Sequence, residues 1–202
     1  MKLRKLAVAA TALLAASAAL AFPIAPFGTE GVAVTVTSTE AIVATYQGNS
    51  ASYSDDLYLA LDGLGNPGDD GDLSNDLFLF NNHASAEGSN VALGSFAIGT
   101  TLVFRLHVND TGDDFYTGPA IRNADGRAHA RVQSEWLPNE ALVSFEDLFG
   151  TPEYPDGFND LSFSFTNTRG GSPRDVDVPE PATLALIGLA LGAAALKRRK
   201  QV

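Results

Sequence analysis

Hydrophobic and polar residues alternate with a period of two along most of this chain. In residues 102–108 and 161–165, every second side chain is apolar and the residues between are mostly polar. This alternation is typical of half-buried antiparallel strands. It predicts strands near 32–36, 41–46, 57–61, 77–80, 91–98, 102–108, 128–132, 141–145 and 161–165. Turn-forming Gly, Pro, Asn and Asp separate these segments, and no convincing helix is predicted between residues 22 and 168. The pattern favours an all-β fold, an antiparallel β-sandwich of jelly-roll-like type.

The N-terminus has the features of a secretory signal peptide. Lys2, Arg4 and Lys5 precede an apolar stretch over residues 6–20, and Ala19 and Ala21 fit the small-x-small cleavage pattern. We therefore expect a signal peptide over 1–21 and a mature chain that starts at Phe22. The alternative is a permanent first transmembrane helix.

The C-terminus combines three features in a fixed order. Val178, Pro179, Glu180 and Pro181 are followed by an uncharged apolar run over 182–196 and by the basic cluster 197–200. As a helix the run would span about 22 Å. That is shorter than the roughly 30 Å hydrocarbon core, so we expect it to engage the membrane through local thinning and snorkelling basic residues.

This tail resembles the PEP-CTERM sorting signal of Gram-negative bacteria. The resemblance implies export, a transient inner-membrane intermediate held by a short transmembrane helix, and cutting near the motif by an exosortase-like protease. The product would reach the cell surface or the exterior. The expected segments are 1–21 (signal peptide), 22–168 (β-sandwich), 169–177 (flexible linker) and 178–202 (sorting signal). The alternative for the tail is an ordinary single-span anchor.

Charge is unevenly distributed along the chain. The whole chain has 24 acidic and 13 basic residues and a net charge of −11. All the acidic residues except Glu180 lie between residues 22 and 177, whereas only six arginines do, so this part has a net charge near −17. Such a surface repels nucleic acid and attracts divalent cations. The acid could equally serve solubility alone. The absence of cysteine excludes disulfides and thiolate metal sites.

The densest acidic segment follows the strand predicted at 141–145. Its sequence, Phe-Glu-Asp-Leu and then Asp-Gly-Phe-Asn-Asp-Leu, resembles a pattern in calcium-associated β-domains of secreted bacterial proteins. Ca²⁺ prefers six to eight oxygen ligands on a bent chain. The candidate ligands are Glu146, Asp147, Asp156, Asn159 and Asp160. We expect a structural calcium site here, with an unliganded acidic turn as the alternative.

Two further acidic loops are weaker candidates. The first contains Asp70, Asp72 and Asp76, but its glycine comes too early for an EF-hand and no glutamate occupies the twelfth position. The second contains Asp110, Asp113 and Asp114.

Catalytic motifs are not evident, so we do not expect an enzyme. His107 and His129 fall on expected polar strand faces, and no metal-binding histidine spacing, nucleophile elbow or phosphate-binding loop occurs. Together the features predict an exported structural or adhesive protein of the cell surface or the extracellular polysaccharide matrix, with calcium as a stabiliser. The alternative is a secreted carbohydrate-binding or carbohydrate-active domain with the same tail, for which Glu135 and Trp136 are the candidate platform.

Overall fold

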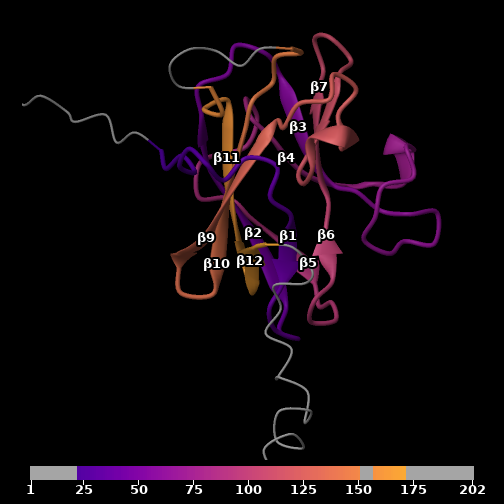
Figure 1. The fold of residues 1–202 in the computed structure, drawn as a ribbon, viewed down its shortest axis with the longest axis vertical. Helices are drawn as coiled ribbons and strands as arrows, with labels where there is room; N and C mark the ends of the chain where they lie inside the picture. The colour runs from indigo at the N-terminus through magenta and orange to yellow at the C-terminus, as the bar shows by residue number, and fades with distance from the viewer. Residues whose placement is uncertain (1–21, 151–156, 172–202) are drawn as a thin grey trace, which may run out of the picture.

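The computed structural model describes residues 22–150 and 157–171, which form antiparallel sheets (Figure 1). The expected all-β sandwich is confirmed. In the described ranges the only helical elements are two short 3₁₀ turns, η1 (Leu73–Asn75) and η2 (Ala120–Arg122). The predicted signal peptide, most of the linker and the apolar sorting helix lie outside the described residues.

Three antiparallel sheets make up the domain. The five-stranded sheet has the order β5 (Asn90–Gly94), β2 (Ile42–Asn49), β11 (Leu161–Thr166), β10 (Glu140–Phe145) and β9 (Ala130–Leu137). The four-stranded sheet has the order β4 (Leu77–Asn81), β3 (Asp55–Leu59), β7 (Phe104–Val108) and β8 (Asp114–Tyr116). A small sheet has the order β12 (Thr168–Gly170), β1 (Val34–Val36) and β6 (Thr101–Leu102).

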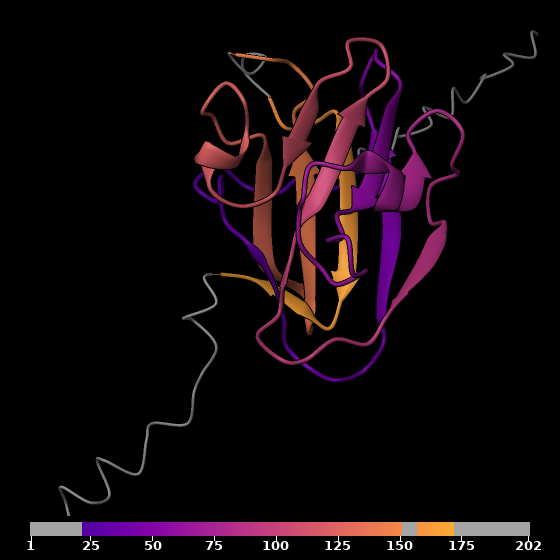
Figure 2. The same ribbon diagram turned by 90° about the vertical axis from the view of Figure 1, so that its right-hand side faces the viewer.

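The two larger sheets face each other across one hydrophobic core, and Figure 2 shows β7 in front of the strands of the five-stranded sheet. Aromatic rings bridge the layers. The Phe104 ring of β7 stacks on Phe165 of β11 with centroids 3.9 Å apart, and Phe80 of β4 lies 5.8 Å from Phe163 of β11. Aromatic pairs bury large apolar areas, so these contacts hold the layers in register.

Polar residues on the outer face of the five-stranded sheet are also buried. The hydroxyls of Ser144 and Ser162 lie 2.7 Å apart, and the Ala25 amide donates to the Ser144 hydroxyl at 2.8 Å. The N-terminal segment therefore covers this face. That cover explains why the serines of β10 and β11 are buried although the sequence alternates.

The structure differs from the sequence-based expectation at three strands. The single strand expected over 102–108 is divided at Val103, whose carbonyl accepts from Ala60, so that β6 joins the small sheet and β7 the four-stranded one. Strand β8 was not expected. Strand β12 pairs Arg169 and Gly170 with β1, so ordered structure continues past residue 168, into the range expected to begin the linker.

Strand ends from both larger sheets meet at one end of the sandwich. Phe145, the last residue of β10, pairs with Leu161, the first residue of β11. Asp55, the first residue of β3, lies beside Asn82, which also contacts Asn49 at the end of β2. This end carries the densest group of buried carboxylates.

Candidate functional site

Antiparallel pairing brings three of the predicted calcium ligands together. Glu146 and Asp147 follow β10 directly and Asp160 precedes β11, so the pairing of Phe145 with Leu161 makes them neighbours. The Asp147 amide donates to Asp160 Oδ2 at 2.8 Å. One carboxylate oxygen from each of the three acids lies within 4.8 Å of the others, and all three side chains are buried. Buried carboxylates at this spacing are suited to holding a cation.

The Glu146 carboxylate also organises the loop between the strands. Its oxygens accept from the Leu148 amide at 3.3 Å and from the Phe158 amide at 3.2 Å. The Glu146 backbone amide donates to the carbonyl of His129. The side chain thus ties the start of the loop to its end.

Of the other two predicted ligands, the structure describes Asn159. The Asn159 carbonyl accepts from the amide and the hydroxyl of Ser50, at 3.2 and 3.0 Å. The Asn159 Oδ1 atom is buried without a hydrogen bond among the described residues. Asp156 lies outside the described residues. The five-residue ligand set therefore stays a prediction, with three members adjacent.

A fourth buried carboxylate, that of Asp55, was not among the predicted ligands. Burial raises its pKa to about 7, and repulsion from Asp160, Asp110 and Asp56 acts in the same direction, whereas contact with Asp147 lowers it. Asp55 shares the inward face of β3 with Leu57 and Leu59. Its spacing of two from Leu57 was the signal in the sequence that could have identified it as inward-facing.

A cavity of about 240 Å³ opens beside the carboxylates. It is lined by Ser50, Ser52, Tyr53, Asp147, Leu148 and Asp160. The lining is mainly polar side chains, and it leaves a route from solvent to two of the acids. Water molecules in such a cavity could complete the coordination of a bound ion.

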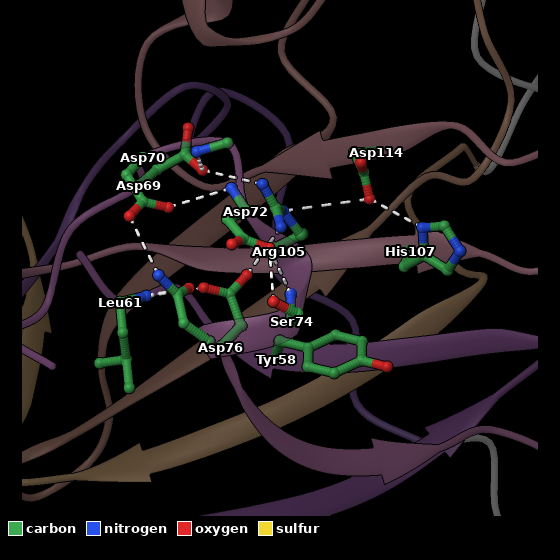
Figure 3. A network of polar contacts seen from close by, with 12 residues as sticks. Tyr58, Leu61, Asp69, Asp70, Asp72, Ser74, Asp76, Arg105, His107 and Asp114 are labelled. Carbon is green, nitrogen blue, oxygen red and sulfur yellow. Dashed lines mark hydrogen bonds and ion pairs between the residues drawn. The ribbon is translucent and has the colours of Figure 1, made fainter. Parts of the chain in front are cut away.

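The second candidate loop is organised around an arginine instead (Figure 3). Arg105 of β7 donates to Asp76 Oδ2 at 2.8 Å and to Asp69 Oδ1 at 2.9 Å. The Leu61 amide donates to the other Asp76 oxygen at 2.8 Å. Burial raises the pKa of Asp76, while that amide and the Arg105 charge oppose the increase.

Local hydrogen bonds engage the remaining acids of this loop. Asp72 accepts from the Ser74 amide at 2.9 Å and so caps η1, and Asp70 accepts from Asn75 at 3.0 Å. Asp70, Asp72 and Asp76 do not form a ligand group in the described part of the chain.

The Arg105 side chain is only 1% exposed, although the alternation placed it on a polar face. The Tyr116 hydroxyl accepts from its Nε at 2.8 Å, and Asp114 lies 4.0 Å away and contacts His107 at 2.8 Å. The expected third acidic loop is therefore divided: Asp114 joins this network, whereas Asp110 accepts from the Ser54 amide. The arrangement fastens the 60–76 loop to the sheet.

His129 was expected on a polar strand face, but the structure places it in the interior. It precedes β9, is fully buried, and stacks on Phe115 with ring centroids 3.9 Å apart. Its Nε2 lies 2.8 Å from Asp125. The alternation failed here because His129 lies before the first strand residue, Ala130.

The candidate carbohydrate platform lies in the β9–β10 hairpin. Residues 135–139 line an open depression of about 470 Å³, and Trp136 is the only aromatic in this lining. Glu135 adopts a positive φ of 51°, next to a register shift between the two strands. One hairpin therefore provides the whole surface, without a concave group of aromatics.

Comparison with known families identifies the tail. Residues 177–200 match the family described as the PEP-CTERM protein-sorting motif. The chain therefore carries a PEP-CTERM sorting signal, which indicates an exported protein that is targeted to an exosortase and passes through a membrane-anchored intermediate towards the cell surface. No curated protein and no solved structure matches the chain. Within residues 22–150 and 157–171, no helix is long and apolar enough to cross a membrane.

Proposed function

We propose that this exported protein is a structural or adhesive component of the cell surface or of the extracellular polysaccharide matrix, and that calcium stabilises its sandwich. The sorting motif supports the destination. The observation that carries the calcium assignment is the buried group of Glu146, Asp147 and Asp160 at the meeting point of β10 and β11.

The chemistry of the residues fits a calcium ion. The group offers only hard oxygen donors, and a cation would offset the mutual repulsion of carboxylates held close together in a buried site. Glu146, Asp147 and Asp160 would hold the ion, and it would tie together two strand ends and the loop between them. An extracellular setting suits such a role, because calcium is available there at concentrations that weak sites require.

A carbohydrate-binding function is the second candidate. It rests on Trp136 and the open depression of the β9–β10 hairpin. Sugar-binding surfaces commonly combine several aromatic platforms with polar groups, whereas this depression contains one aromatic. The acidic group is therefore the better-supported site.

Replacing the sorting motif should trap the protein in the membrane. With Glu180→Gln, or with Pro179 and Pro181 both changed to alanine, we expect loss of the released form, because proline keeps a recognition segment extended. The measurement is immunoblotting of membrane and medium fractions from cells with an exosortase, together with the intact mass of released protein. Glu40→Gln, an exposed change in the sandwich, is the control and should be released normally. Release of the motif variants at the control level would refute exosortase-dependent processing.

Calcium should raise the melting temperature of the full chain purified in mild detergent. At a hundredfold excess over Kd, an ion that binds only the folded state stabilises it by about 2.7 kcal/mol. For a domain of this size that corresponds to roughly 5–10 °C. Melts are compared in chelator, in calcium, in magnesium and in NaCl of matched ionic strength. Magnesium should act less strongly because it gives up its waters reluctantly.

A variant assigns the effect to the site. Asp160→Asn keeps an acceptor for the Asp147 amide but removes a charge, so it should abolish most of the calcium-specific shift. Equal melting midpoints of the wild type in calcium and in matched NaCl would show that calcium only screens the charges of the acidic residues and does not bind a site.

A further inference from the structure

We propose that Asp55 is a further ligand of the calcium ion, so that the ion joins the two facing sheets of the sandwich. The inference rests on the proposed calcium function and deepens it. Glu146, Asp147 and Asp160 all belong to the ends of β10 and β11 in one sheet. Asp55 begins β3 in the opposite sheet. An ion held by all four would therefore bridge the layers.

The Asp55 carboxylate has an oxygen without a donor. The side chain is fully buried, and no N–H or O–H group of the described residues donates to its Oδ1. The Asp147 carboxyl contacts the Asp55 carboxyl. Two ionised carboxyl groups in contact repel each other, and a cation between them would remove that repulsion. The contact and the unpartnered Oδ1 atom therefore point to a cation at this place.

Asn82 holds the Asp55 side chain in a fixed orientation. Its amide nitrogen donates to Asp55 Oδ2 at 3.0 Å and its Oδ1 accepts from the Asp55 amide at 2.9 Å. The Asn82 amide nitrogen also donates to the carbonyl of Tyr53, a residue of the cavity wall. Because Asn82 engages Oδ2, the Oδ1 atom of Asp55 remains available to a cation bound by Asp147 and its neighbours. Such positioning of a ligand by a neighbouring amide is typical of built metal sites.

The bridge would act at the end of the sandwich where the buried carboxylates gather. The stacked rings of Phe104 and Phe165 join the sheets within the core, whereas at this end the facing groups are carboxylates. Without an ion their repulsion works against closure of the sheets. With an ion the same groups hold the sheets together.

The test is calcium binding and melting of the full chain in mild detergent, for the wild type and for Asp55→Asn. The asparagine can still accept from Asn82, and its amide can donate to Asp147, so it removes the repulsion between the two carboxyls. At pH 7.5 in chelator we expect Asp55→Asn to melt at a higher temperature than the wild type. In calcium we expect a smaller rise in melting temperature for Asp55→Asn than for the wild type. We also expect its calcium affinity to be at least about tenfold weaker, since a charged ligand is lost.

A matched control separates a ligand from a buried structural carboxylate. The Asp76 side chain is also buried, at 1% exposed, but it pairs with Arg105. Asp76→Asn should lower the midpoint in chelator and in calcium alike, and should keep the full calcium shift.

Each outcome bears on one of the two proposals. If the wild type shows no calcium-specific shift, the proposed calcium function fails. If the wild type shifts and Asp55→Asn shifts equally, or melts lower by the same amount in both conditions, calcium binding stands but Asp55 is not a ligand. Should Asp55→Asn not fold, a wild-type structure grown with calcium gives the answer. An Asp55 oxygen about 2.3–2.6 Å from the ion supports the inference, and an ion outside contact distance overturns it.

Discussion

Replacing Arg105 by methionine is expected to lower the free energy of unfolding by about 3–5 kcal/mol, the usual range when one partner of a buried ion pair is removed. Methionine fills much of the volume but leaves Asp76 buried without its positive partner. The Tyr116 hydroxyl also loses the guanidinium that donates to it. The measurement is urea unfolding of the full chain in mild detergent, followed by the fluorescence of Trp136.

Two variants make the Arg105 result specific. Arg127→Met removes an exposed arginine from the same domain and should change the stability by less than about 0.5 kcal/mol. Arg105→Lys keeps the charge but not the planar set of donors, so its loss should be intermediate. Equal stabilities of Arg105→Met and Arg127→Met would show that the network contributes no more than a surface charge.

In chelator, the stability of the wild type should decrease relative to that of Asp55→Asn as the pH rises from 4.5 to 7.5. The Asp55 pKa is about 7 in the folded state against an ordinary value of 3.8, so between these values the folded state binds the extra proton. The contribution is complete below the lower pKa and is lost as the pH rises through the higher one. At about 1.4 kcal/mol per pH unit, the difference should approach about 3 kcal/mol between pH 4.5 and 7.5.

The comparison of the two proteins isolates this effect from the other acids. Asp160, Asp110, Asp56 and Asp147 all influence Asp55, but they are present in both proteins. The measurement is urea unfolding at several pH values with chelator present. If the free energy of unfolding changes with pH in parallel for the wild type and Asp55→Asn, the pKa of Asp55 is not raised in the folded state.

The strands that the sequence predicted well are those that supply alternating apolar residues to the core. In β7 and β11 the core side chains are strongly apolar and are separated by polar residues. Strands β8 and β12 are three residues long and were not predicted. Their pairing comes from the backbones of β7 and β1, a non-local contribution that composition does not reveal.

The candidate site was only partly predictable for a similar reason. Glu146, Asp147 and Asp160 flank two strands that follow each other in sequence and pair, so sequence proximity was informative. The position of Asp55 depends on which sheet faces which. Arg105 was assigned to a polar face correctly, but its burial depends on a loop that covers the sheet, and period-two alternation carries no information about such cover.

The pairing of β1 with β12 links completion of the fold to the order of biosynthesis. Thr35, beside the centre of the small sheet, donates to the carbonyl of Gly171, 136 residues further along the chain. A ribosome makes β1 first, and β6 can pair with one of its edges early, whereas the partner of its other edge, β12, appears only just before the sorting motif at 177–200. Contacts so distant in sequence form slowly. The small sheet can therefore be completed only when synthesis has nearly reached the sorting signal.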